Sequence, residues 1–249
     1  MDKFKKYVWV TGASSGLGKS LSIVLAGQGH TVVVSARDHQ KLDELSDQYP
    51  NIIPFPCDIT DEKQMNEAGA GLAAISPVFD QVYLNAGNCE YMDFSDPDWG
   101  IPARVMDVNY FGSIRCLRAV WPLLESASGF RAHIVVIASQ VTSAPFPRAE
   151  AYGASKAAVQ YFFNSLRTDL AQGNIDISIV NPGFVDTPLT QKNNFKMPFL
   201  MDVDAAAKLI VNRMRFRPRT YDFPLRLKLM LSLSGWFPRL WQKLVSQSF

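Results

Sequence analysis

Short apolar runs rich in β-branched residues alternate along this chain with longer stretches in which apolar residues recur at helical spacing. The connections between the short runs are too long for hairpins, so successive runs are expected to be parallel strands joined by right-handed crossovers. The predicted strands are residues 7–11, 31–35, 52–55, 81–84, 133–138 and 176–180, followed by an edge strand at 219–223. The predicted helices are residues 17–28, 40–48, 62–74, 105–125, 151–171 and 205–214.

This order of elements predicts an α/β fold with a doubly wound, Rossmann-like parallel sheet that carries helices on both faces. The chain has 249 residues, of which 47% are hydrophobic, and this suffices for the core of one domain. No linker, low-complexity tract or fixed repeat divides the sequence, so residues 1–249 are expected to form a single domain. Residues 224–249 are predicted to be a helical appendix to that domain.

Charge and composition exclude several classes of function. The chain has 25 Lys and Arg against 23 Asp and Glu, and this balance gives no reason to expect nucleic acid as a partner. Cys57, Cys89 and Cys116 are odd in number and lack CxxC spacing, which argues against a disulfide framework and favours a reducing, cytoplasmic setting. The histidines are scattered, so no metal site is expected. No apolar stretch approaches the roughly 18 residues of a membrane span, so a soluble protein is expected.

A glycine-rich turn joins the first predicted strand to the first predicted helix. It reads Thr11-Gly12-Ala13-Ser14-Ser15-Gly16-Leu17-Gly18. Glycines let the backbone approach a pyrophosphate, and the free amides and dipole of the helix start favour an anion there. An ordinary strand-to-helix turn is the alternative, but the strand, turn and helix in this order favour dinucleotide binding. The glycine spacing differs from the G-x-G-x-x-G of many such folds.

Tyr152 and Lys156 form the most specific pair in the sequence. Residues four apart lie on one face of a helix, so the phenol and the ammonium can point into one pocket. A tyrosine has an ordinary pKa of about 10. A nearby ammonium, joined by the positive nicotinamide of an oxidised dinucleotide cofactor, is expected to lower that pKa toward a useful range for proton transfer. The alternative is a pair of surface neighbours on a helix, which is a common arrangement.

Together, the turn TGxxxGxG and the segment Tyr152-Gly-Ala-Ser-Lys156 resemble the compact, single-domain branch of the short-chain dehydrogenase/reductase family. The resemblance covers roughly residues 7–190. It implies that Ser139, which follows the fifth predicted strand, orients the substrate, and that Asn109 positions a water for proton relay. The expected catalytic residues are therefore Asn109, Ser139, Tyr152 and Lys156.

The end of the second predicted strand bears on the choice of dinucleotide. A protein that prefers NAD(H) is expected to carry an acid there to bind the ribose 2′-hydroxyl, but this chain has Ala36. Arg37 beside it could pair with a 2′-phosphate, although a solvated arginine is the alternative. NADP(H) is therefore favoured over NAD(H). With the lining that the resemblance implies, the expected cofactor-binding residues are Gly12, Ser14, Ser15, Gly16, Leu17, Gly18, Arg37, Asp58, Ile59, Asn85, Ala86, Gly87, Tyr152, Lys156, Pro182, Gly183, Val185 and Thr187.

The resemblance implies an oxidoreductase that transfers a hydride between NADP(H) and a carbonyl or alcohol substrate, with Tyr152 as general acid and base. Residues 188–203 fall where the family has its substrate loop. Phe195, Met197 and Phe199 in this loop, with Phe146, Pro147 and Trp99 as further wall residues, indicate an apolar substrate. The alternatives are a 3-oxoacyl-(carrier protein) reductase and a non-catalytic NADP(H)-sensing protein. The presence of both Tyr152 and Lys156 argues against the latter.

The end of the chain combines leucine and tryptophan with basic residues. From Arg213 onward there are eight Lys or Arg and one acid, Asp222. This segment could pack on the sheet, roof the substrate pocket or contact a second subunit, and the resemblance implies a homodimer or homotetramer. The alternative is an amphipathic helix on an anionic membrane surface. A cytoplasmic protein is expected. The alternative is a cytoplasmic protein that contacts a membrane peripherally through this segment.

Overall fold

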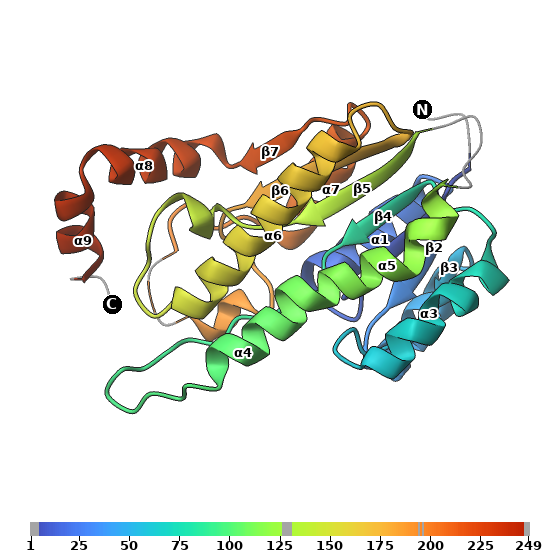
Figure 1. Ribbon diagram of the computed structural model, residues 1–249, viewed down its shortest axis with the longest axis horizontal. Coiled ribbons are helices and arrows are strands. Elements are labelled where there is room, and N and C mark those ends of the chain that lie inside the picture. The colour runs from blue at the N-terminus through green and yellow to red at the C-terminus, as the bar shows by residue number, and fades with distance from the viewer. Residues whose placement is uncertain (1–4, 126–130, 194, 196, 247–249) are drawn as a thin grey trace.

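A computed structural model of the protein describes residues 5–125, 131–193, 195 and 197–246. Within these residues, seven strands form one parallel sheet in the order β3-β2-β1-β4-β5-β6-β7 (Figure 1). The strands are β1 (Tyr7–Thr11), β2 (Thr31–Ser35), β3 (Ile52–Pro54), β4 (Gln81–Leu84), β5 (Ala132–Ile137), β6 (Ile175–Pro182) and β7 (Thr220–Phe223). The strand order reverses between β1 and β4, and ligands bind at such a switch point in open α/β sheets.

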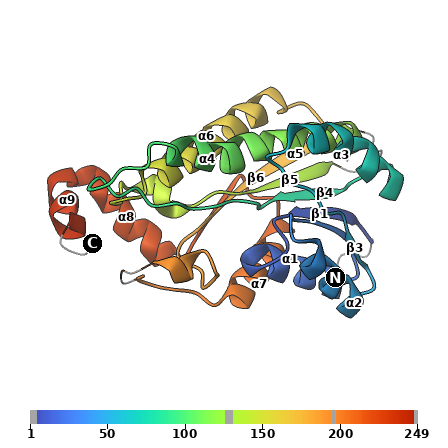
Figure 2. The ribbon, with the colours of Figure 1, turned by 90° about the horizontal axis from the view of Figure 1, so that it is seen from below.

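Helices cover both faces of the sheet, as the sequence predicted. One face carries α1 (Gly16–Gly27), α2 (His39–Gln48) and α7 (Val203–Met214), and the other carries α3 (Glu62–Ile75), α4 (Ile101–Met106), α5 (Gly112–Glu125) and α6 (Glu150–Asp169) (Figure 2). Successive residues of β1 alternate between the two cores. Val8 and Val10 pack on the α1 side, and Trp9 packs on the α5 side, all fully buried.

Aspartate side chains cap the N-termini of α2, α3 and α7. Asp38 accepts a hydrogen bond from the Lys41 amide at 3.2 Å, and Asp202 accepts one from the Ala205 amide at 2.8 Å. At the start of α3, the Asp61 side chain accepts hydrogen bonds from the amides of Lys63 and Gln64. Each such cap typically stabilises a protein by about 1 kcal/mol, because it satisfies a free amide of the first turn.

The helix predicted over residues 105–125 begins earlier and is not regular. α4 continues into a π-helical segment, Asp107–Phe111, and then into α5. Apolar spacing does not distinguish one wider turn from an ordinary one, so the sequence pattern gave no sign of it. Such segments occur often at functional sites, and this one contains Asn109.

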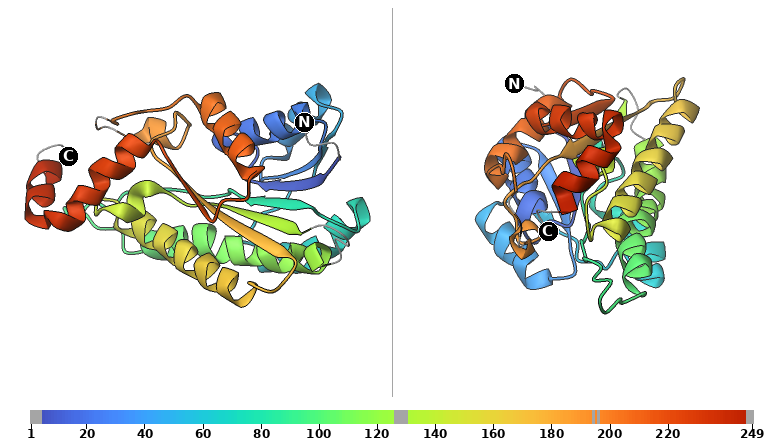
Figure 3. Two further views of the ribbon diagram at one scale, coloured as in Figure 1. Left: turned by 90° about the horizontal axis from the view of Figure 1, so that it is seen from above. Right: turned by 90° about the vertical axis from the view of Figure 1, so that its left-hand side faces the viewer.

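Beyond the carboxyl end of the sheet, α8 (Leu225–Trp236) and α9 (Pro238–Ser246) project as a separate pair (Figures 1 and 3). Leu227 and Leu231 are buried against the domain, whereas Leu225 and Leu229 on the same helix are exposed. No helix in the described part of the chain is both long and apolar enough to cross a membrane. Residues 247–249 of the expected appendix lie outside the described residues.

Candidate active site

A cleft of about 760 Å³ runs along the carboxyl ends of the strands. Its walls come from the turn after β1, the ends of β2, β4, β5 and β6, and the start of α6. Every residue expected to bind the cofactor, from Gly12 to Thr187, lines this cleft. The structure thus brings together eighteen positions that the sequence spreads over more than 170 residues.

The glycines of the first turn are required by its shape. Gly12 has a φ of 69°, and a Cβ added there would lie 2.7 Å from the Cα of Ala86. A Cβ at Gly18 would lie 2.2 Å from the carbonyl oxygen of Gly12. The absent side chains leave a cradle at the start of α1, whose first residue is Gly16, and this fits a pyrophosphate group.

Thr11 and Asn85 hold this turn against the end of β4. The Thr11 hydroxyl accepts hydrogen bonds from the amides of Asn85 at 3.0 Å and Ala86 at 3.1 Å. The Asn85 side-chain amide donates in return to the Thr11 carbonyl at 2.9 Å. Sequence reasoning assigned Asn85 to the cofactor and did not single out Thr11. The structure shows that both shape the cradle.

Arg37 lies exposed on the cleft wall where the adenosine ribose is expected. Asp38 beside it forms a salt bridge with Lys41 at 2.8 Å and also caps α2. The Asp38 charge is therefore largely offset, so Arg37, Asp38 and Lys41 together present a positive charge to this end of the cleft. This charge fits a 2′-phosphate better than a neutral 2′-hydroxyl.

Tyr152 and Lys156 face the opposite end of the cleft from the first two turns of α6. The Lys156 ammonium donates to the carbonyl of Ile137 at 2.9 Å and lies 5.9 Å from the centre of the Tyr152 ring. Ser139 follows β5 and lines the same cleft, and its hydroxyl accepts from the Val141 amide at 3.1 Å. The structure therefore places these three expected catalytic side chains at one wall.

Burial shifts the pKa values of both Tyr152 and Lys156. It raises the pKa of the Tyr152 phenol well above its ordinary value near 10, and a hydrogen bond with Ser139 opposes that rise only in part. Burial lowers the pKa of the Lys156 ammonium to about 8. The sequence argument expected Lys156 and the positive nicotinamide together to lower the pKa of Tyr152, and that expectation concerns the complex with the oxidised cofactor. A protonated phenol in such a pocket is suited to donate its proton.

Asn109 is buried and does not line the cleft. Its side-chain amide donates to the Asn88 carbonyl and to the Ser155 hydroxyl, each at 2.9 Å, and its oxygen accepts from the Asn88 amide at 2.8 Å. Asn109 thus fastens the loop after β4 to the helix that carries Tyr152. Sequence reasoning did not single out Asn88 or Ser155, although Ser155 stands inside the Tyr152 motif.

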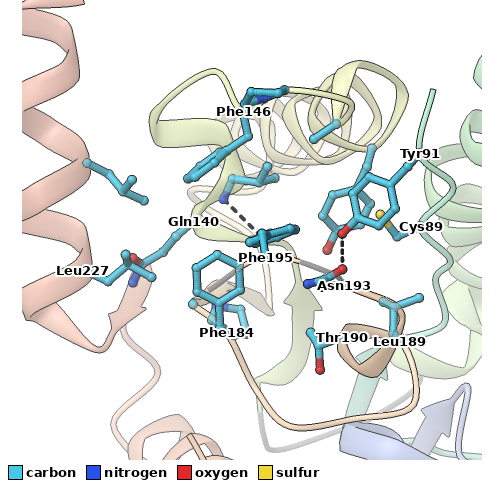
Figure 4. A pocket seen from close by; sticks show the side chains of 18 residues that line it. Cys89, Tyr91, Gln140, Phe146, Phe184, Leu189, Thr190, Asn193, Phe195 and Leu227 are labelled. Carbon is cyan, nitrogen blue, oxygen red and sulfur yellow. Dashed lines mark hydrogen bonds between the residues drawn. The ribbon is translucent and has the colours of Figure 1, made fainter. Parts of the chain in front are cut away.

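An apolar pocket of about 90 Å³ adjoins the catalytic wall (Figure 4). It shares Ser139 and Tyr152 with the cleft, as well as Pro182, Gly183, Leu189 and Thr190. Phe146, Pro147 and Phe195 line it as the sequence suggested. Met197, Phe199 and Trp99 do not line it, and Phe199 and Trp99 are exposed. Residues 194 and 196 of the expected substrate loop lie outside the described residues.

Further hydrogen bonds hold together the segments around this pocket. The Tyr91 hydroxyl donates to the side-chain oxygen of Asn193, which joins the loop after β4 to the loop after β6 across the pocket (Figure 4). Gln160 of α6 donates to Thr142 at 2.9 Å and to Asn181 at 2.7 Å. These contacts hold the segment after Ser139 against the end of β6. Neither Tyr91 nor Gln160 carries a local sequence signal, because their partners are distant in the chain.

Comparison with known proteins gives consistent matches. The chain matches the short chain dehydrogenase family over residues 6–198. It is 32% identical over 195 residues to dehydrogenase/reductase SDR family member 7B of Xenopus laevis, covering 74% of this chain and 59% of that protein. It is 34% identical over 205 residues to an uncharacterized oxidoreductase of Myxococcus xanthus, covering 81% and 80% of the two chains. The solved RhlG/NADP active-site complex of Pseudomonas aeruginosa superposes with a TM-score of 0.69 at 25% identity, over 75% of each chain.

Proposed function

The chain belongs to the short-chain dehydrogenase/reductase family of oxidoreductases, and from this membership and the geometry of the cleft we propose an NADP(H)-dependent enzyme that acts on an apolar carbonyl or alcohol. One observation carries the proposal. Ser139 and Tyr152 line both the long cleft and the apolar pocket, so a substrate oxygen in the pocket lies beside both hydroxyls and next to the cleft. The chain spans 59% of the length of the Xenopus relative. The activity is therefore proposed for this chain and is not taken over from that longer protein.

The residues of the cleft fit a nicotinamide dinucleotide. The cradle at Gly12 and Gly18 suits the pyrophosphate, and Tyr152 with Lys156 lies at the other end. When bound, NADPH supplies a hydride to the carbonyl carbon. The chain's own part is to orient the carbonyl oxygen through Ser139 and Tyr152 and to donate the Tyr152 proton to it. Alcohol oxidation is the reverse of these steps.

NADP(H) is the proposed cofactor in preference to NAD(H). Ala36 stands where an acid would bind a 2′-hydroxyl, and Arg37 lies exposed beside it. The pairing of Asp38 with Lys41 largely offsets the opposing charge. The similar RhlG structure was solved with NADP, which supports the same preference.

Turnover by the Tyr152→Phe variant tests the proposed function. NADPH depletion is measured with ketones, aldehydes, steroids and 3-oxoacyl thioesters, and with NADH in parallel. Tyr152→Phe is expected to lower kcat by roughly 10²- to 10⁴-fold, because the proton donor is lost while the ring remains. Its NADPH Kd should stay within about twofold of the wild type. Retained turnover in Tyr152→Phe would reject the role of the phenol, and faster use of NADH would reject the cofactor preference.

We also propose that the outward face of α8 and α9 contacts an anionic membrane surface. Leu225, Leu229, Leu233 and Trp236 recur along one side of α8 and are all more than half exposed. Arg226, Arg239 and Lys243 are exposed on the same two helices. An apolar face with flanking cations suits anionic lipid. A homodimer or homotetramer, which family membership also suggests, would cover the same face instead.

A further inference from the structure

A second apolar cavity, of about 520 Å³, lies beyond the pocket next to Tyr152. It is formed mainly by α8 and α9, through Met230, Leu233, Phe237, Leu240 and Leu244. We call it the tail groove. Its walls are almost entirely hydrocarbon, so its occupant must be apolar.

The tail groove adjoins the catalytic pocket across a shared wall. Phe146, Phe184, Phe195 and Leu227 line both cavities. Phe184 and Phe195 meet edge to face with their ring centres 5.9 Å apart. Figure 4 shows this pair in the middle of the pocket, with Leu227 of α8 on one side and Tyr91 on the other. Phe184 and Phe195 thus lie between the two cavities, and a substrate that extends past these rings from the catalytic wall reaches the groove.

The sizes of the two cavities favour a substrate that occupies both. The pocket beside Tyr152 has a volume of about 90 Å³. Ligand pockets are usually about 300–1,000 Å³, a range that the tail groove reaches and the catalytic pocket does not. The pocket therefore holds a reacting carbonyl with a few atoms around it, and the rest of the molecule lies elsewhere.

The polar groups of the groove wall already have partners within the chain. The Trp241 indole N–H donates to the Pro145 carbonyl at 2.7 Å, and the ring lies 5.5 Å from Phe146. The Ser234 hydroxyl points to the Ser143 carbonyl at 3.4 Å. These contacts have two consequences. They use the side-chain donors of the wall within the chain, and they fix α9 to the segment that follows Ser139, so the groove keeps its position relative to the catalytic wall.

We infer that the substrate is an elongated lipophilic molecule whose reacting carbonyl or hydroxyl lies near one end. That end lies at Ser139 and Tyr152, and the hydrocarbon tail runs past Phe184 and Phe195 into the tail groove. This inference rests on the proposed function and adds the substrate class to it.

The inference is tested with methyl ketones of increasing length, from 2-pentanone to 2-undecanone, and NADPH. Burial of one methylene is worth about fourfold in binding, so kcat/KM is expected to rise by roughly that factor for each carbon that enters the groove. Leu233→Arg places a charged group on the groove wall, and it should greatly reduce the ratio of kcat/KM for 2-undecanone to that for 2-pentanone. Leu229→Arg is the matched control, because Leu229 lies on the same helix, is 67% exposed against 57% for Leu233, and does not line the groove.

A binding measurement separates failure of this inference from failure of the proposed function. Nile red is bound to the wild type and to both variants, and its displacement by 2-pentanol and 2-undecanol is followed by fluorescence. The longer alcohol should displace the dye at much lower concentration in the wild type and in Leu229→Arg, but not in Leu233→Arg. If no ketone is reduced while this pattern holds, the proposed function fails and the groove assignment stands. Equal ketone efficiencies or equal alcohol displacement at both chain lengths would overturn the inference.

Discussion

Among single residues, Lys156 couples the candidate site to pH. Burial lowers the pKa of its ammonium from the ordinary value of 10.5 to about 8, so Lys156 is charged below that pH and neutral above it. The pKa of Tyr152 is raised, so the phenol keeps its proton over the same range. We therefore predict that kcat for carbonyl reduction falls as pH rises through about 8. The measurement is kcat from pH 6 to 9.5 at saturating NADPH and ketone.

The Lys156→Arg variant serves as the control for this pH dependence. A guanidinium stays protonated throughout the range, so the activity that remains should show no step near pH 8. A wild-type kcat that is constant or rising between pH 7 and 9.5 would show that the charge of Lys156 does not govern the reaction. A step that persists in Lys156→Arg would assign the titration to another group.

At the scale of elements, the start of α1 is where packing most restricts the residue type. Gly18→Ala would place a Cβ 2.2 Å from the Gly12 carbonyl oxygen and 2.5 Å from the Asn85 amide nitrogen, so the cradle must shift. Overpacking of this kind costs about 1–3 kcal/mol. If this cost reduces the free energy of cofactor binding, the NADPH Kd should rise by roughly 5- to 150-fold. Fluorescence titration with NADPH measures the change.

Gly27→Ala is a matched control within α1, because a Cβ there meets no atom within 4 Å. Its NADPH Kd should equal that of the wild type, and its Tm should be unchanged or slightly higher, since alanine favours a helix by about 0.5–1 kcal/mol over glycine. If Gly18→Ala binds NADPH as tightly as Gly27→Ala, the turn is not the pyrophosphate cradle.

Local patterns in the sequence predicted the elements well and their contacts poorly. The strands at residues 7–11, 31–35 and 81–84 have the predicted bounds, because runs of apolar and β-branched residues form buried strands with little help from distant residues. The π-helical segment around Asn109 was not predicted, since its spacing of apolar residues is that of a plain helix. The partners of Asn109 lie 21 and 46 residues away, and only the fold brings them to it.

At the scale of the whole molecule, one face of α8 packs on the domain and the other is exposed to solvent. Leu227 and Leu231 are buried and close the catalytic pocket, which is the roof that the sequence offered as one reading of the appendix. Leu225, Leu229 and Trp236 face outward on the same helix. The helix is therefore apolar on two sides, whereas a surface helix usually has one apolar stripe that faces the core. The tail groove opens beside this face, since Leu233 belongs to both.

The outward face is predicted to bind vesicles that contain anionic lipid. At low salt, the protein should co-sediment with phosphatidylcholine vesicles that contain phosphatidylglycerol, and should do so weakly at high salt or without the anionic lipid. Each basic residue at a membrane surface is worth about 1 kcal/mol, so Arg239→Ala with Lys243→Ala should weaken binding by roughly 30-fold. Trp236→Ala should also weaken it, whereas Tyr161→Ala should not, because Tyr161 is equally exposed, at 79% against 81%, but lies on α6. Absence of co-sedimentation, together with a dimer or tetramer in sedimentation velocity that Trp236→Ala dissociates, would assign the face to a second copy of the chain instead.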